Sequence, residues 1–408
     1  MTRFSGRPHG SVTAIAPQTT HRYMICAAWP GQKRLRGLPG ELPDDLTATL
    51  DCIRALGAAA VFRDDTLEIT GINAKPDVLR LDCRDSGATY RLLYPVAPLI
   101  GGRAEFMLSP SLAARPMEPV TELLKSKGVA AEKLSVSGSF GPGEFPIRGD
   151  VSSQYISGLL LALSLLEGES RIRLTTPLQS KSYVELTRAS LSAFGGESQW
   201  MGQDTILVKP RRLKAADVTV EGDYTHASLF LAAGAVYGPV TVTGLDPGSI
   251  QGDRAMLSIL DRMGARVDMG GGSVTVSPGR LRGIDVDVSD TPDLAPAIAL
   301  AALAAEGSTV VKNGGRLRFK ECDRISAIAT ELKRLGADID EAPDGFTIRG
   351  GGKLHGAACL CHNDHRIAML LIMAAGLCGG IELNGAECVS KSAPGFFDEY
   401  RQLGGSIS

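Results

Sequence analysis

A short charged run carries the residues best suited to acid–base chemistry, and it reads Arg318-Phe319-Lys320-Glu321-Cys322-Asp323-Arg324. Apolar residues follow at helical spacing as far as Gly336, which is typical of a helix end, so we expect the run to open a helix. Lys320 and Arg324 then place positive charge where the helix dipole favours negative charge. A solvated surface run is the ordinary explanation. The alternative is an anion-binding site in which Glu321 transfers a proton.

A second carboxylate, Asp293, follows Thr291-Pro292 at the start of a long apolar segment. It either caps that helix or works with Glu321 as a general acid–base pair, if a cleft tunes their pKa values.

Two cysteines and two histidines at positions 359, 361, 362 and 365 raise the question of a metal. They are too crowded and no second cluster accompanies them, so no metal site is expected. A P-loop, a dinucleotide-binding glycine motif and a nucleophile elbow are also lacking.

The composition limits the classes of protein to consider. The chain has 408 residues, too many for one core, so two domains are expected. A net charge of −2 argues against a nucleic-acid or membrane-binding surface, so anions would have to meet local basic clusters. Eight cysteines without a framework spacing indicate reduced thiols, and no signal peptide or membrane-spanning run is visible. We therefore expect a cytoplasmic protein.

An amphipathic helix, a glycine and a short strand recur six times along the chain. The glycines are roughly 70 residues apart, a spacing that is hard to obtain by chance and that indicates six copies of one unit. They are Gly57, Gly128, Gly195, Gly264, Gly336 and Gly404. Alternating runs between them, such as Thr66–Thr70 and Ser273–Val276, are typical of strands.

A second series of six helices runs in phase with the first, and each member has a polar start and a mostly apolar body. Segments Ile156–Leu166, Ala227–Val236 and Leu294–Ala305 are apolar nearly all round, so they should be buried. If these helices are parallel within each half of the chain, their N-termini meet on one face and attract anions. Serines and aspartates at helix starts are ordinary caps in most cases. Four arginines at such starts are better explained by function, and these are Arg22, Arg91, Arg324 and Arg366.

Together these motifs resemble those of the 5-enolpyruvylshikimate-3-phosphate synthase family. Lys320-Glu321-Cys322-Asp323-Arg324 is similar to the family's Lys-Glu-x-Asp-Arg signature, and the stretch from Asp85 to Arg91 is similar to its glycine–arginine loop. Further matching stretches follow in the family order and cover nearly the whole chain. They are Arg115-Pro116-Met117, Ser152-Ser153-Gln154, Ser180-Lys181-Ser182-Tyr183, Asp364-His365-Arg366 and Lys391.

The resemblance implies an α/β (α+β) fold of two domains, each with three βαβαββ-type repeats around buried parallel helices. It places the active site in the interdomain cleft. The chain would begin in one domain, cross near Ala16 and return near Glu221. The expected domains are therefore residues 1–15 plus 222–408 and residues 16–221. This division agrees with the sixfold repeat found from the glycine spacing.

The resemblance also implies a shikimate-pathway reaction, in which the enolpyruvyl group of phosphoenolpyruvate passes to the 5-hydroxyl of shikimate 3-phosphate and phosphate is released. Glu321 would move the methylene proton with His365 nearby, Asp293 would contact or deprotonate the hydroxyl, and Lys320 would act beside them while holding shikimate 3-phosphate. Residues implied to hold phosphoenolpyruvate are Arg115, Arg324, Arg366 and Lys391. Those implied to hold shikimate 3-phosphate are Arg22, Ser152, Ser153, Ser180 and Tyr183. Gln154 would lie between the two ligands, Gly87 would lie where the backbone approaches the ligand closely, and Arg91 would be a further substrate-binding residue. No cofactor, nucleic acid or membrane is implied, and a monomer is expected.

The N-terminal stretch departs from the family pattern, which reads roughly Ser-Lys-Ser-x-Ser-x-Arg. Counting back from Arg22 places Pro17 at the lysine, and a one-residue deletion places Gln18 there, so neither alignment supplies the cation. Losing one electrostatic donor costs about 3–4 kcal/mol of transition-state stabilisation. Other cations that could supply the charge are Lys33, Arg34, Arg36 and Arg316.

Two other functions stay open from the sequence. A catalytically impaired or repurposed homologue would bind a phosphorylated ligand in the same anion site without transferring a group. An enolpyruvyl transferase acting on a UDP-sugar would lack the Lys-Glu-x-Asp-Arg signature and use a loop cysteine, for which the chain has no good candidate. Phosphate release from mixed substrates separates the first alternative from the transferase.

Overall fold

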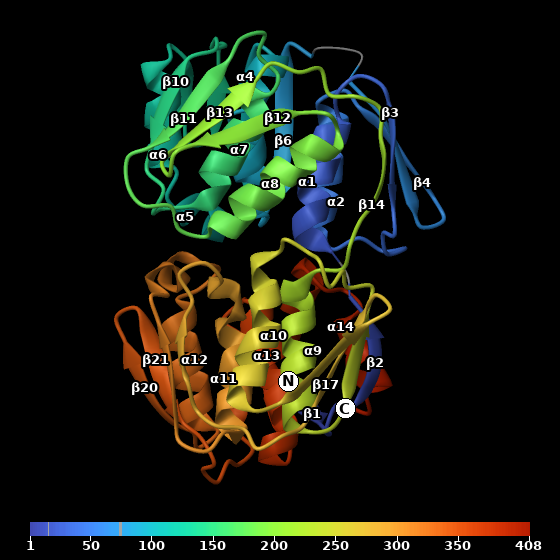
Figure 1. Cartoon of the computed structure of the whole chain (residues 1–408), viewed down its shortest axis with the longest axis vertical. Helices are drawn as coiled ribbons and strands as arrows, with labels where there is room; N and C mark the ends of the chain where they lie inside the picture. The colour runs from blue at the N-terminus through green and yellow to red at the C-terminus, as the bar shows by residue number, and fades with distance from the viewer. Residues whose placement is uncertain (15, 73–75) are drawn as a thin grey trace. The chain divides into compact units, whose positions relative to one another are not determined.

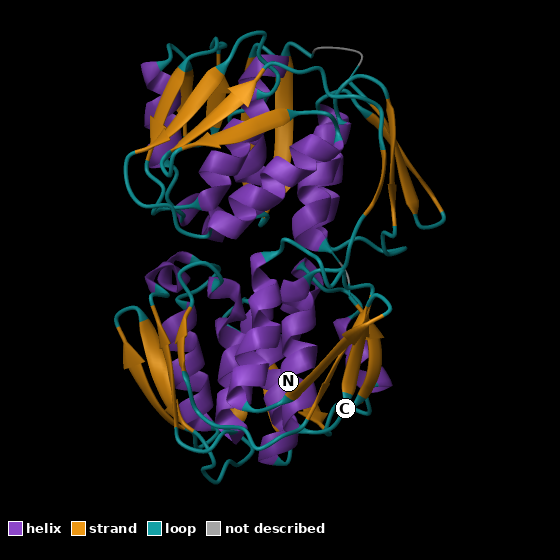
Figure 2. Cartoon of the chain, in the orientation of Figure 1, coloured by secondary structure: helices purple, strands orange, loops and turns teal. Residues whose placement is uncertain are grey.

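The computed structural model describes residues 1–14, 16–72 and 76–408. The chain divides into two compact units: unit 1 contains Met1–Ile15 and Glu221–Ser408, and unit 2 contains Ala16–Val220. Within each unit, helices gather at the centre and small sheets lie around them (Figure 2). Among the described residues, no helix is long and apolar enough to cross a membrane.

Six four-stranded sheets form in the described ranges, and all share one pairing pattern. The first strand is parallel to the second, and the third is antiparallel to the second and the fourth. In unit 1, one sheet contains β22 (Ala358–Leu360), β23 (Ile381–Asn384), β1 (Thr2–Ser5) and β24 (Ser406–Ile407). Another contains β2 (Gly10–Thr13), β15 (Val240–Thr243), β17 (Ser273–Ser277) and β16 (Arg266–Gly270). The last contains β18 (Asp285–Asp287), β19 (Ser308–Lys312), β21 (Gly345–Arg349) and β20 (Asp338–Ala342).

Unit 2 has three sheets of the same kind (Figure 1). One contains β14 (Asp217–Thr219), β3 (Gln32–Arg36), β5 (Thr66–Thr70) and β4 (Ala59–Arg63). Another contains β6 (Val78–Arg84), β7 (Arg103–Leu108), β9 (Ser135–Ser137) and β8 (Ala130–Glu132). The last contains β10 (Glu144–Ile147), β11 (Ser170–Leu174), β13 (Thr205–Lys209) and β12 (Glu197–Met201).

One series of helices forms the buried centre of each unit, as predicted. Its members are α1 (Pro17–Ala27), α3 (Gly87–Leu93), α7 (Ser153–Leu163), α9 (Tyr224–Val236), α11 (Ala295–Ala304) and α13 (His365–Cys378). In α9 every residue from Tyr224 to Ala235 is buried, which fits a helix that is apolar nearly all round. Helix α7 begins three residues earlier and ends three residues sooner than the Ile156–Leu166 segment predicts, because Ser152 caps its start.

The amphipathic series covers these buried helices, and each of its members is followed by one of the predicted glycines. Its members are α2 (Asp44–Ala55), α6 (Glu118–Ser126), α8 (Lys181–Ala193), α10 (Ala255–Met263), α12 (Arg324–Arg334) and α14 (Phe396–Gln402). All six glycines have φ between +82° and +103°, a left-handed conformation that residues with a Cβ adopt only at a cost. The shorter helical elements are α4 (Ala97–Ile100), α5 (Pro110–Ala114), η1 (Gly252–Arg254), η2 (Pro292–Leu294), η3 (Gly315–Phe319) and η4 (Ala386–Lys391).

Each repeat runs βαβαββ, so the predicted architecture is confirmed. Three repeats are continuous in sequence, and the other three borrow one strand from a distant segment. Strand β2 pairs in parallel with β15, β1 enters the sheet beside β23, and β14 pairs in parallel with β3. The first 13 residues therefore complete two sheets of unit 1. Each unit keeps its own hydrophobic core.

Candidate active site

In unit 1 the residues predicted for chemistry meet where several helices begin. Asp293 lies in η2 just before α11, Arg324 begins α12, and Arg366 lies in the first turn of α13. Arg324 Nη1 donates to Asp293 Oδ1 at 2.7 Å, and Arg366 Nη2 lies 3.8 Å from Asp293 Oδ2. The N-terminal ends of these three helices therefore lie together, as the repeat predicts for the buried helices α11 and α13.

The helix at the charged run begins later than the sequence predicts. The first residues of the run lie in η3, and α12 starts only at Arg324. The cause is Asp323, whose carboxylate accepts a backbone N–H of the first turn at 3.1 Å and caps the helix. Lys320 and Glu321 therefore lie in the connection before the helix, where the backbone is not constrained to helical geometry.

Arg324 is the centre of this cluster and is buried among three carboxylates. Its guanidinium donates to Asp293 and to Asp364, each at 2.7 Å, and also to Glu321. Burial opposes the positive charge, but the three carboxylates outweigh it and hold the pKa of Arg324 well above its usual value. With three partners, the guanidinium has a fixed orientation.

Lys320 and Asp293 form a second ion pair, with 3.1 Å between Nζ and Oδ1. Burial lowers the pKa of Lys320, although the charge of Asp293 opposes this. Burial also disfavours ionised Asp293, yet Lys320, Arg366 and Arg324 together hold the pKa of Asp293 well below its usual range. Asp293 is thus a carboxylate whose ability to accept a proton depends on how closely these cations remain paired to it.

His365 and Lys391 lie next to the same cluster. His365 is buried, and within the described part of the chain its Nδ1 has no hydrogen-bond partner. Burial and the charge of Arg366 lower the pKa of His365 to about 4, so the imidazole is neutral at pH 7. Lys391 ends η4 and donates from Nζ to the carbonyl of Asn363 at 2.9 Å, beside the start of α13.

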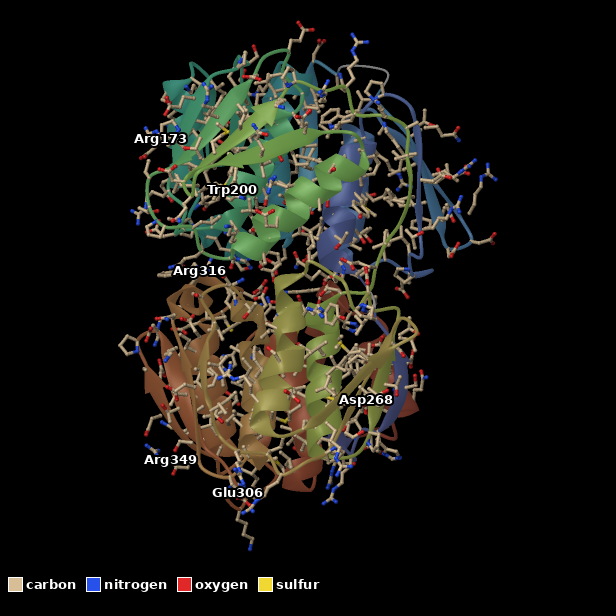
Figure 3. The ribbon with its side chains drawn as sticks, viewed as in Figure 1. Arg173, Trp200, Asp268, Glu306, Arg316 and Arg349 are labelled. Atoms are coloured by element: carbon tan, nitrogen blue, oxygen red, sulfur yellow. The ribbon has the colours of Figure 1, made fainter. Side chains whose placement is uncertain are left out.

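Of the four cations considered as substitutes for the missing lysine, Arg316 lies closest in sequence to this cluster. Its guanidinium donates to the carbonyl of Ser289 at 2.7 Å, and its charge adds to the burial that lowers the pKa of Lys320. Figure 3 shows Arg316 at one end of unit 1 and Glu306 and Arg349 at the other. Arg316 therefore stays a candidate.

The remaining three candidates, all in unit 2, are occupied elsewhere, which corrects the expectation. Lys33 donates to two backbone carbonyls beyond the C-terminal end of α1. Because α1 has 11 residues and spans about 16 Å, Lys33 lies a helix length from its first turn. Arg34 pairs with Glu68 at 3.0 Å, and Arg36 pairs with Asp217 at 2.9 Å. For Arg34 and Arg36, local sequence could not reveal this, because their partners come from other strands.

In unit 2, Arg22 is buried against the first turns of α8. Its Nε donates to Thr187 Oγ1 at 2.7 Å, and its guanidinium carbon lies 6.0 Å from the centre of the Tyr183 ring. Ser180 directly precedes α8 and has φ of +52°, in the left-handed region. The structure therefore brings Arg22, Ser180 and Tyr183 to one helix start.

A second group in unit 2 surrounds the start of α3. Arg91 Nη1 donates to Gln154 Oε1 at 2.9 Å. A Cβ on Gly87 would lie 3.2 Å from Arg115 Nη1 and 3.3 Å from Arg91 Nη1. Glycine at this position thus lets two guanidinium groups approach the backbone closely. Gly87, Arg91, Arg115 and Gln154 belong to one cluster.

Helix α7 connects the two groups of unit 2. Ser152 caps it by accepting the backbone N–H of Gln154 at 3.3 Å, so the ordinary capping explanation holds for this serine. Ser153 is buried in the first turn. Thr187 of α8 donates to Ser157 of α7 at 2.8 Å, and the same hydroxyl holds Arg22.

Two contributors to these clusters were assigned no role in the site from the sequence, Asp364 and Thr187. Asp364 is fully buried; one oxygen accepts the backbone N–H of Arg366 at 2.9 Å and the other holds Arg324. Its position before a helix predicted a cap, and that signal does not reveal the second contact. Thr187 lies inside an amphipathic helix and carries no signal at all.

Over the described ranges, no three His, Cys, Asp or Glu side chains are grouped to hold a metal ion.

Comparison with known protein families matches residues 4–400 to the family described as EPSP synthase (3-phosphoshikimate 1-carboxyvinyltransferase). The chain belongs to this family. Proteins named 3-phosphoshikimate 1-carboxyvinyltransferase from two strains of Clostridium botulinum are 37% and 39% identical to it, over 99% of the chain and 97% of each relative.

Solved structures lead to the same EPSP synthase fold. The structure of EPSP synthase from Acinetobacter baumannii is similar to this chain with a TM-score of 0.81 and 26% identity, over 100% of this chain and 99% of that chain. The enolpyruvyl transferase NikO from Streptomyces tendae is similar in fold, with a TM-score of 0.79, 21% identity and coverage of 100% and 98%. The fold predicted from the repeat and the resemblance is confirmed.

Proposed function

We propose that this EPSP synthase family member transfers the enolpyruvyl group of phosphoenolpyruvate to the 5-hydroxyl of shikimate 3-phosphate and releases phosphate. The observation that carries the proposal is the cluster of unit 1, in which Asp293 and Glu321 share the buried Arg324 beside Lys320. The reaction needs one group for a hydroxyl proton, another for a carbon-bound proton, and cations for anionic substrates. This cluster contains all three kinds of group.

The proposed reaction consists of an addition and an elimination. In the addition, the 5-hydroxyl oxygen bonds to C2 of phosphoenolpyruvate, Asp293 accepts the hydroxyl proton, and protonated Glu321 gives a proton to the methylene carbon. In the elimination, the bond from C2 to the phosphate oxygen breaks, and phosphate leaves with the electron pair. Glu321 then takes a proton from the methyl carbon, and the proton on Asp293 passes to phosphate, so both carboxyl groups return to their starting states.

The ion pairs of unit 1 suggest how substrate binding prepares Asp293. Lys320, Arg324 and Arg366 are all paired with Asp293. Phosphate and carboxylate groups of the substrates compete for these cations. As the pairing weakens, the pKa of Asp293 rises toward its usual value, and the carboxylate becomes a stronger base. His365, neutral at pH 7 by its lowered pKa, assists proton movement near Glu321.

The substrate assignments draw on the cluster of unit 1 and on the two groups of unit 2. A fixed guanidinium beside hydroxyl groups suits a phosphate ester, which supports placing shikimate 3-phosphate at Arg22. The residues assigned to shikimate 3-phosphate are Arg22, Ser152, Ser153, Ser180, Tyr183 and Lys320. Those assigned to phosphoenolpyruvate are Arg115, Arg324, Arg366 and Lys391, with Gly87, Arg91 and Gln154 next to both ligands. The enzyme acts as a cytoplasmic monomer without a cofactor in this proposal.

Phosphate release tests the proposed function. Mixing both substrates with the full chain should release phosphate, and either substrate alone should release none. Glu321→Gln keeps the shape of the side chain but cannot exchange the proton, so turnover should fall by about 10²–10⁴-fold. Asp338→Asn changes an exposed carboxylate of the same unit and should leave turnover unaltered. Binding heat without phosphate release in the unaltered chain would instead indicate a repurposed homologue.

A further inference from the structure

The turn between β22 and α13 holds two consecutive non-glycine residues in the left-handed conformation. His362 has φ of +53° and Asn363 has φ of +55°. The backbone N–H of Asp364 donates to the carbonyl of Cys361 at 2.9 Å across them, the pairing of a type I′ turn. Because neither residue is glycine, the conformation carries a cost that other contacts must offset.

The contacts on one side of this turn come from Glu331 of α12. Its carboxylate accepts the backbone N–H of Leu360 at 3.1 Å and contacts His362 Nε2 at 2.8 Å, with Arg334 Nε at 3.5 Å. The Glu331 side chain is only 1% exposed, and a buried carboxylate is costly unless its partners are supplied. Glu331 follows Arg324 by two helical turns, so α12 contacts the segment around this turn at two points.

The other side of the turn contacts the cluster of unit 1. The carbonyl of Asn363 accepts a hydrogen bond from Lys391 Nζ at 2.9 Å. Asp364, the next residue, caps α13 and holds Arg324 Nε at 2.7 Å. The backbone of the turn therefore places one partner for each of two cations that we assign to phosphoenolpyruvate.

We propose that Glu331 and His362 are positioning residues, whose contact fixes the turn that aligns Lys391 and Arg324. This inference rests on the proposed function for the identity of the ligand. Neither residue belongs to the cluster around Arg324 in unit 1, so each acts through the backbone at Asn363 and through Asp364. Loss of their contact should weaken the use of phosphoenolpyruvate and leave the use of shikimate 3-phosphate nearly unchanged.

Two substitutions at His362 separate this role from a general effect on stability. Asn adopts the left-handed conformation readily, but its side chain is too short to reach Glu331 as Nε2 does. Gln is less suited to the conformation, but its amide nitrogen can occupy the place of Nε2. If only the turn preference matters, His362→Asn is the milder change. If the contact matters, His362→Gln is the milder change.

The experiment measures KM for each substrate, kcat and the thermal midpoint of the full chain. His362→Asn should raise KM for phosphoenolpyruvate about tenfold and alter KM for shikimate 3-phosphate less than about twofold, whereas His362→Gln should recover most of the loss. His355→Asn, a change of an exposed histidine in the same unit, should alter neither KM. Glu331→Gln should resemble His362→Asn in direction and serves as the test if that variant does not fold.

The possible outcomes distinguish this inference from the proposed function. Equal values of KM for phosphoenolpyruvate in the two His362 variants, or a change that only follows the thermal midpoint, would overturn the positioning role. If the unaltered chain binds phosphoenolpyruvate without releasing phosphate, the proposed function fails, and the same comparison of dissociation constants by calorimetry then decides the inference. If the unaltered chain does not bind phosphoenolpyruvate, both fail.

Discussion

Arg324 shows how one side chain can set the charge state of its neighbours. Three carboxylates share its guanidinium, and the fork of N–H groups matches them in a way that a lysine ammonium cannot. Its pairing with Asp293 contributes to the lowered pKa of that carboxyl group. A separate hydrogen bond from Arg324 holds Glu321, so one cation holds both carboxylates to which we assign the proton transfers.

His365 should make unit 1 sensitive to acid. Its pKa is about 4 in the folded chain, because burial and Arg366 disfavour the charged form, against about 6.5 when unfolded. Between these values the unfolded state binds more protons than the folded state. The free energy of unfolding is therefore unaffected by His365 above about pH 6.5 and decreases as the pH falls toward 4. His365→Gln should reduce the difference between thermal midpoints at pH 7 and pH 4.5. An unchanged difference, or an equal reduction in His355→Asn, would contradict the assignment.

The residue types and their order identified most of the cluster in unit 1. Asp293, Lys320 and Glu321 meet Arg324 because they lie at or before the starts of two helices of one repeat, α11 and α12, and the sequence marked both starts by their polar residues. Asp364 was missed because a helix cap is a local feature, whereas its contact with Arg324 is a tertiary one. The choice among substitute cations depended on tertiary partners for the same reason.

At the scale of elements, the glycine that follows each helix of the amphipathic series affects stability in two ways, through its backbone conformation and through close packing. Gly264 and Gly404 have φ of +103° and +88°, so replacement of either by Ala costs about 1–2 kcal/mol in backbone conformation. A Cβ at Gly264 would also lie 2.5 Å from the carbonyl oxygen of Arg280, whereas at Gly404 the nearest atom, Cε1 of His9, is 3.5 Å away. Gly264→Ala should therefore lower the thermal midpoint clearly more than Gly404→Ala. Equal shifts would show that close packing adds nothing at Gly264.

Helix and strand types were predictable, whereas some boundaries and pairings were not. The six glycines located the outer helices because a left-handed residue ends a helix irrespective of tertiary context. The start of α12 was misplaced because Asp323, rather than the basic residues before it, provides the cap. Strands β1, β2 and β14 pair with segments far away in the sequence, and alternating patterns cannot specify such partners.

At the scale of the whole molecule, six copies of one motif produce two units of the same internal design. The repeat places polar helix starts together within each unit, and each such meeting point carries arginines. Unit 1 gathers the carboxylates suited to proton transfer, and unit 2 gathers arginines and hydroxyl groups suited to anions. The proposed function assigns both substrates to these groups, so its failure would leave the fold explained and the charges unexplained.

Proton exchange at the methylene carbon of phosphoenolpyruvate tests most directly whether Glu321 transfers a proton to and from that carbon. In D₂O with shikimate 3-phosphate present, the full chain should incorporate deuterium into that methylene group, detected by proton NMR, as protonation and deprotonation by Glu321 reverse. Incorporation should cease without shikimate 3-phosphate and should fall with turnover in Glu321→Gln. Phosphate release without any incorporation, or equal incorporation in Glu321→Gln, would contradict the addition and elimination assigned to this cluster.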